Sequence, residues 1–209
     1  SRNEIRSHLL ISEGLGGFVD SEVPSELLSF ESGFNESVVR VGGTLADMNG
    51  DGFTDLVAGS EPLGLHIFYG QEETNGQYFG KAEQLPAGTY GRSDSIIVSL
   101  EAYDFNSDGL LDLLVSNTDD YVGRGLLVLI LLQDGTFEDR TDAVLVNFDL
   151  EAGWTNNFNF GDINGDGHED IILSPVGVLV NDGLCRFNEL GVGAGYSDAI
   201  NDVATYQFA

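Results

Sequence analysis

The chain has 209 residues, and 42% of them are hydrophobic, which is enough to bury the core of one large β domain or two small ones. The 35 Asp and Glu residues against 8 Lys and Arg residues give a formal net charge of -27. A surface this acidic repels phosphate backbones and anionic lipids, so we expect no nucleic-acid partner and no direct membrane insertion. Cys185 is the only cysteine, so no disulfide can form within the chain.

Short β-type runs begin the chain and then recur in three similar units. His8 to Ser12 and Phe18 to Val23 flank a glycine-rich turn and predict a hairpin. Three acidic segments follow, DMNGDGFTDLVAG from Asp47, DFNSDGLLDLLVS from Asp104 and DINGDGHEDIILS from Asp162, and they start 57 and 58 residues apart. A constant period of this size indicates a repeat protein.

Each unit predicts four antiparallel strands, and the acidic segment joins the first strand to the second. In the second unit, strands are expected at Leu113 to Val115, Leu126 to Leu132 and Thr136 to Asp139, with an Asp134-Gly135 turn before the last. Glycine-rich turns and only 4 prolines fit hairpins, and no long helical period is present. Four antiparallel strands per unit favour a blade of a β-propeller. A β-solenoid is the alternative, but its coils are usually shorter and lack such hairpins.

The predicted fold is therefore all-β, a single partial β-propeller domain over residues 1–209. Tyr206 to Ala209 resembles Phe158 to Gly161, which leads directly into Asp162, so a further blade is expected to begin at the C-terminus. Propellers close with roughly four to eight blades, so we expect further sequence to complete the ring. The expected parts are the second half of a blade at 1–36, whole blades at 37–89, 90–145 and 146–197, and the first strand of the next blade at 198–209.

The acidic segments share the pattern D-x-N-x-D-G-x-x-D, and we name them loop one (47–55), loop two (104–112) and loop three (162–170). Oxygens at positions one, three and five can converge on one cation if the chain coils around it, and glycine at position six permits the positive φ of that turn. The main-chain carbonyl at position seven and the carboxylate at position nine can add further oxygens. The candidate metal ligands are Asp47, Asn49, Asp51, Phe53 and Asp55, then Asp104, Asn106, Asp108, Leu110 and Asp112, then Asp162, Asn164, Asp166, His168 and Asp170.

This donor set favours three Ca²⁺ ions, one in each loop. Hard oxygen donors without a thiolate or imidazole cluster select Ca²⁺ over zinc or copper, and Mg²⁺ is the weaker candidate because it demands a stricter octahedron. The loops are not EF-hands, because position twelve is Ala58, Val115 or Leu173 instead of glutamate. The alternative is an ordinary Asn-Gly or Asp-Gly turn without metal. A turn needs no further aspartates at fixed spacing, and their threefold recurrence favours metal binding.

With these residues in view, the chain resembles the FG-GAP/VCBS repeat family, which includes the integrin α-subunit propeller. The stretch Phe160-Gly161-Asp162 matches the motif that names the family, whereas the other two units have Leu45-Ala46 and Ala102-Tyr103 in place of Phe-Gly. The LLQDGTF stretch at residues 131–137 resembles the NNGDGTF hairpin of the VCBS branch. The resemblance implies a seven-bladed propeller, usually secreted or on the cell surface, with mainly structural calcium on one face.

The face opposite the calcium loops is where a protein or glycan ligand is expected, because ligands usually meet propellers there. Aromatic side chains beside polar groups suit such contacts, although some of them could equally pack between blades. The candidate ligand-binding residues are Tyr90, Arg92, Asp119, Asp120, Tyr121, Arg124, Trp154, Asn156 and Tyr196.

Three functions remain open at this point. The first is a non-catalytic binding or adhesion module of a larger extracellular protein. The second is the propeller domain of a secreted polysaccharide-acting enzyme, and the third is a structural spacer in a surface filament or sheath. We expect no catalysis, because His8 and His66 lie in predicted strands, His168 lies in loop three, and Cys185 lies in a strand-like LCRF stretch. Asn35 begins a single glycosylation sequon, which matters only in a eukaryotic source.

Overall fold

The structure is a computed structural model, and it confirms an all-β chain built mainly from antiparallel sheets. Within the described ranges the regular structure consists of fifteen strands and one helix of four residues. No helix in these ranges is long and apolar enough to cross a membrane. The structure describes residues 9–12, 17–21, 42–60, 64–74, 77–85, 95–119, 122–148, 155, 157–174 and 177–190.

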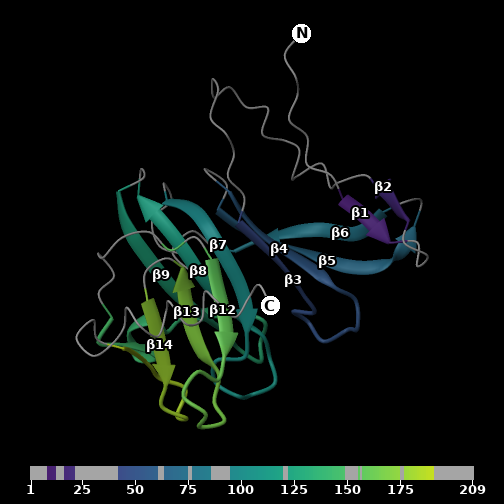
Figure 1. Cartoon of the computed structure of the whole chain (residues 1–209). Helices are drawn as coiled ribbons and strands as arrows, with labels where there is room; N and C mark the ends of the chain where they lie inside the picture. The colour runs from purple at the N-terminus through teal and green to yellow at the C-terminus, as the bar shows by residue number, and fades with distance from the viewer. Residues whose placement is uncertain are drawn as a thin grey trace.

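A separate hairpin precedes the three larger sheets. Its strands β1 (Leu9–Ser12) and β2 (Phe18–Ser21) pair antiparallel and form a two-stranded sheet (Figure 1). The sequence predicts this hairpin from the glycine-rich turn between two apolar runs. Leu10 and Phe18 are largely exposed on it.

Three sheets follow, and each corresponds to one unit of the sequence repeat. We name them sheet one, sheet two and sheet three. Each contains four consecutive antiparallel strands in chain order, as the turn signals predict. Sheet one has β3 (Gly42–Ala46), β4 (Asp55–Ser60), β5 (Gly64–Thr74) and β6 (Gln77–Gln84). Sheet two has β7 (Ser95–Tyr103), β8 (Asp112–Asp119), β9 (Val122–Leu131) and β10 (Phe137–Asp139), and sheet three has β12 (Asn157–Gly161), β13 (Asp170–Ser174), β14 (Gly177–Asn181) and β15 (Phe187–Glu189).

Sheet three carries a fifth strand that the four-strand expectation does not include. After β10 the chain makes the short helix α2 (Thr141–Val144) and then β11 (Leu145–Val146), which pairs parallel to β15. The Thr141 hydroxyl accepts a 3.0 Å hydrogen bond from the Val128 N–H, and this contact holds the helix against sheet two. The strand β11 therefore ties the segment leaving sheet two to the outer edge of sheet three and protects that edge from other strands.

Sheet two is the middle layer, and its second strand supplies side chains to both neighbours. The side chains of successive strand residues point to opposite faces. Leu113 and Val115 accordingly belong to the core shared with sheet one, whereas Leu114 belongs to the core shared with sheet three, and all three are fully buried. This explains why Leu113 to Val115 form a continuous hydrophobic run in β8. Figure 1 shows β7 running between β3 and β12, so the first strands of the three sheets are neighbours.

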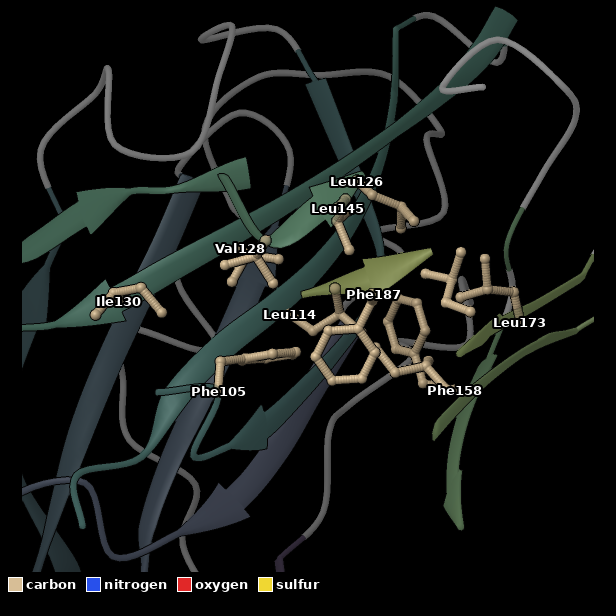
Figure 2. Packing of buried hydrophobic residues seen from close by; sticks show 12 residues of the cluster. Phe105, Leu114, Leu126, Val128, Ile130, Leu145, Phe158, Leu173 and Phe187 are labelled. Atoms are coloured by element: carbon tan, nitrogen blue, oxygen red, sulfur yellow. The ribbon is translucent and has the colours of Figure 1, made fainter. Parts of the chain in front are cut away.

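Two hydrophobic cores fill the spaces between the three sheets. The core between sheets two and three contains Phe105, Leu114, Phe158 and Phe187, which Figure 2 shows gathered from both layers. Polar contacts also cross the interfaces. The Ser116 hydroxyl donates to the Thr155 carbonyl at 2.9 Å, and the Thr44 hydroxyl donates to the Glu101 carboxylate at 3.2 Å.

Close approach of the layers depends on glycine at one position. A Cβ added at Gly59 in β4 would lie 2.6 Å from a side-chain carbon of Ile97 in β7. Gly59 therefore lets sheets one and two pack directly against each other.

The second residue of each acidic loop differs in its burial. Met48 is 3% exposed and Phe105 is 2% exposed, because both enter the cores between neighbouring sheets. Ile163, at the same position of loop three, is 44% exposed. This position therefore contributes to sheet packing in loops one and two.

We predict that Phe105→Ala lowers the free energy of unfolding by about 3 to 5 kcal/mol, because it leaves a cavity between sheets two and three. Ile163→Ala is the matched control at the same loop position, and less than about 1 kcal/mol is expected there because that side chain is partly exposed. Urea denaturation followed by circular dichroism measures both values. Equal losses in the two variants would contradict the assignment of Phe105 to the interface.

Candidate metal centre

The three acidic loops occupy equivalent places in the three sheets. Each one joins the first strand to the second, from β3 to β4, from β7 to β8 and from β12 to β13. The loops therefore lie at corresponding ends of their sheets, as the sequence predicts (Figure 1). Their internal hydrogen bonds are also nearly the same.

The position-one aspartate lies at the centre of each coil. In loop one, Asp47 Oδ1 accepts the N–H groups of Gly50 and Asp51 at 2.8 and 3.1 Å, and Oδ2 accepts the N–H of Gly52 at 2.9 Å. In loop three, Asp162 accepts the three equivalent N–H groups at 2.7, 3.1 and 2.9 Å. In loop two, Asp104 accepts the N–H groups of positions five and six at 3.2 and 3.0 Å. The backbone therefore winds around one carboxylate in every loop.

Positions three and five are also linked in the same way in every loop. In loop three, Asn164 Oδ1 accepts the Asp166 N–H at 2.9 Å, and Asn164 Nδ2 donates to Asp166 Oδ2 at 2.8 Å. Asp166 Oδ1 in turn accepts the His168 N–H at 2.9 Å. The His168 N–H and the Asn164 amide lower the pKa of the Asp166 carboxyl, so it is ionised near neutral pH. Loops one and two repeat these bonds.

Two positions in each loop adopt left-handed backbone, and the shared sequence pattern predicted only one of them. Position six is glycine in all three loops, with φ between 87° and 89°. Position four also has positive φ, at Gly50 (73°), Ser107 (59°) and Gly165 (78°). Glycine at position four in two of the loops is the signal that could have revealed this requirement.

The position-nine aspartate has a different environment from the other candidate ligands. Asp55, Asp112 and Asp170 are all 0% exposed. In loop two, Asp112 Oδ2 accepts the Phe105 N–H at 2.9 Å, and Oδ1 accepts the Leu131 N–H of β9 at 2.8 Å. Asp55 and Asp170 make the equivalent pairs of bonds at 2.7 to 3.0 Å. Each carboxylate thus fastens the start of its loop to the third strand of its sheet, and its assignment as a metal ligand stays a prediction.

The donor chemistry of the loops fits a hard cation. Within the described residues, no group of three or more Asp, Glu, His or Cys side chains by itself forms a metal site. Each loop instead combines the carboxylates of positions one and five with the amide oxygen of position three, and all of these side chains are partly or fully exposed. A carboxylate oxygen has more than one lone pair, so it can accept an N–H and still coordinate an ion. Oxygen donors of this kind suit Ca²⁺.

His168 and Cys185 lie close to the same turn, and one expectation about them was wrong. A Cβ added at Gly183 would lie 2.7 Å from His168 Nε2, so the imidazole packs against the turn between β14 and β15. Cys185 was expected in a strand, but it lies in this turn with φ at 62°, before β15 begins at Phe187. The tight hairpin needs a left-handed residue there, which the apolar LCRF pattern does not reveal.

Most of the predicted ligand face lies outside the described residues. The main chain of Asp119 belongs to β8 and that of Arg124 to β9, and only their main chains are described. The structure therefore does not test this candidate site. The candidates outside the described ranges are Tyr90, Arg92, Asp120, Tyr121, Trp154, Asn156 and Tyr196. The sequon at Asn35 also lies outside these ranges.

The sheet-and-loop unit defines the chain as a β-repeat protein with one acidic loop in each of its three sheets. The chain belongs to the FG-GAP-like repeat family, because the family model matches residues 47–115 and 104–173, which together include all three loops. This confirms the resemblance seen in the sequence. No curated protein sequence matches the chain significantly.

One similar solved structure is described as the structural basis of specific recognition of non-reducing terminal N-acetylglucosamine by an Agrocybe aegerita lectin. The sequences are 20% identical, and the TM-score is 0.47. The match covers 74% of this chain but only 39% of the lectin chain. At this TM-score the similarity supports no conclusion about the ligand of this chain.

Burial changes the acidity of one position-nine carboxylate. Desolvation raises the pKa of the Asp112 carboxyl to about 6, because it outweighs the two N–H donors from Leu131 and Phe105. The negative charges of Asp108 and Asp104 raise this pKa further. In the calcium-free protein, Asp112 therefore takes up a proton well above the pH at which an unfolded aspartate does.

We predict that this shift makes the calcium-free fold less stable as the pH rises from about 4 to above 6. In that window the folded protein retains a proton at Asp112 that the unfolded chain has released, so the free energy of unfolding falls with rising pH. A difference of about 2 pKa units corresponds to about 3 kcal/mol. Urea denaturation of wild type and Asp112→Asn at several pH values isolates this contribution, because the other carboxylates titrate in both proteins.

The stability advantage of wild type over Asp112→Asn is expected to be largest near pH 4 and to shrink by about 3 kcal/mol at pH 7. An advantage that is constant or grows with pH would contradict the raised pKa.

Proposed function

We propose that the chain is part of a calcium-stabilised β-propeller that acts as a non-catalytic binding or adhesion module of a larger extracellular protein. The observation that carries the proposal is the recurrence of one loop in three consecutive sheets, with nearly the same hydrogen bonds in each. An ordinary hairpin turn has no need of a central aspartate surrounded by N–H groups. A calcium loop needs such a coil to gather its oxygen donors.

Calcium would be held by the position-one and position-five carboxylates, the position-three amide oxygen and the position-seven carbonyl of each loop, with the position-nine carboxylate as a further candidate ligand. When bound, it supplies positive charge that offsets the mutual repulsion of the loop aspartates in a chain of net charge -27. Extracellular calcium modules bind with a Kd of roughly 10⁻⁴ to 10⁻³ M, so such loops fill where calcium is millimolar. We therefore propose an extracellular or cell-surface setting.

The propeller assignment is supported by the arrangement of the three sheets. Each is an antiparallel meander, their faces pack through shared cores, and their first strands lie side by side. Blades around a central axis pack in this way, and we propose a ring of roughly seven blades, within the known range of propeller sizes. Further sequence would supply the remaining blades.

A protein or glycan is the proposed ligand, bound on the face opposite the calcium loops. A glycan array, tested beside an activity screen on polysaccharides, separates the binding module from the alternatives. Binding without turnover supports the module, whereas turnover would assign the chain to a polysaccharide-acting enzyme. The absence of both binding and turnover would favour a structural spacer.

We predict that the folded chain binds three calcium ions and that removing them lowers the melting temperature by at least about 5 °C. The reason is linkage, because each site at a few millimolar calcium adds about 1 to 3 kcal/mol to the free energy of unfolding. Calorimetric titration and thermal melts with and without chelator measure these quantities. Fewer than two ions per chain, or a melt that chelator does not change, would contradict calcium binding.

A single loop can be tested with a matched pair of variants. Asp108→Ala removes a central carboxylate of loop two, so two ions should remain. Asp134→Ala removes an exposed aspartate in the turn between β9 and β10, where Asp134 Oδ1 accepts bonds from the N–H and the hydroxyl of Thr136, so three ions should remain. Three ions in Asp108→Ala would show that the ligand assignment is wrong.

A further inference from the structure

Loop two is preceded by an aromatic side chain that reaches the neighbouring sheet. Tyr103 is the last residue of β7, directly before Asp104 at position one. Its ring makes an edge contact with Phe105, at a centroid distance of 5.1 Å, and Phe105 makes an edge contact with Phe187 of sheet three at 5.6 Å. Side chains on both sides of Asp104 therefore belong to one aromatic chain between the sheets.

The same tyrosine contacts residues at both ends of loop three. Its ring stacks on Phe160, with 4.6 Å between centroids and 7° between planes, and Phe160 lies two residues before Asp162. Its phenol lies close to the carboxylate of Glu169, at position eight, directly before Asp170.

Loops one and two have no equivalent contact. The residue directly before loop one is Ala46, whose side chain is too short to stack on the next sheet. Position eight of loop two is Leu111, which cannot accept a hydrogen bond through its side chain. Ala46 and Leu111 both pack against the apolar core between sheets one and two. The chain thus contains one linked and one unlinked pair of neighbouring loops.

We propose that Tyr103 couples loops two and three, so that calcium bound in one loop raises the affinity of the other. This inference rests on the calcium binding proposed above. An ion orders the loop that holds it, and the ordered Asp104 segment fixes the Tyr103 ring against Phe160 and Glu169. The neighbouring loop then loses less conformational freedom when it binds its own ion, which gives positive coupling. The effect is reciprocal because it is a free energy shared by two binding equilibria.

Electrostatics acts in the opposite direction and gives the competing outcome. Two bound cations repel each other, and this repulsion alone would make the second ion bind more weakly. It acts between loops one and two as well as between loops two and three. The comparison of the two pairs therefore separates the aromatic link from charge repulsion.

The binding of each loop can be followed separately by two-dimensional NMR of the full chain during a calcium titration. The position-six amides of Gly52, Gly109 and Gly167 donate to the position-one carboxylates at 2.9, 3.0 and 2.9 Å, so each amide reports on its own loop. Asp108→Asn disables loop two and is expected to raise the calcium midpoint at Gly167 by about fivefold, near the lower end of typical coupling. Asp51→Asn disables loop one and is the matched control, which should not raise the calcium midpoint at Gly109, because loops one and two have no aromatic link.

The role of the tyrosine is tested by repeating the comparison in Tyr103→Leu, where Asp108→Asn should no longer shift the Gly167 midpoint. If Tyr103→Leu does not fold, Tyr103→Phe keeps the stacked ring and should lose part of the coupling. Full coupling in the variant that folds would overturn the role of Tyr103. An unchanged or lowered Gly167 midpoint in Asp108→Asn would overturn the coupling alone. If none of the three glycine amide signals changed during the calcium titration, the calcium proposal would be overturned as well.

Discussion

A carboxylate with no exposure to solvent holds each acidic loop to its sheet. Burying an ionisable group without partners is costly, and the position-nine aspartates reduce that cost by accepting two backbone N–H groups each. One donor belongs to position two of the loop and the other to the third strand or its end. The bond at position two also fixes where that residue's side chain points, and Phe105 thereby enters the core between sheets two and three. Loop shape and sheet packing therefore depend on the same carboxylate.

This arrangement separates two tasks within one short motif. Position nine is buried and links strands, while positions one, three and five are partly or fully exposed and present oxygens around the coil. A metal ion in the exposed part would stabilise a loop whose base is already attached to the sheet. Nine of the aspartates of the chain lie in these three loops, and the calcium proposed there would offset their mutual repulsion.

The sequence predicts much of this structure because its signals are local. Asp-Gly and Asn-Gly turns and short apolar runs indicate the strands, and the constant spacing of the loops indicates three equivalent sheets. The double role of aspartate could not be separated, since a metal ligand and a buried hydrogen-bond acceptor both require a carboxylate. The parallel strand β11 is only two residues long, and Cys185 adopts a left-handed conformation that apolar neighbours do not indicate. The exposure of Ile163 and the burial of Phe105 depend on neighbouring sheets, which no local pattern reports.

The most direct test of calcium in these loops is the anomalous-difference density of crystals grown in millimolar calcium. We predict one peak in each loop, about 2.3 to 2.6 Å from the position-one and position-five carboxylates, with the position-nine aspartates still accepting their two N–H groups. Loops that show the same coil without an anomalous peak would contradict the account. They would show that the internal hydrogen bonds alone explain the repeated motif.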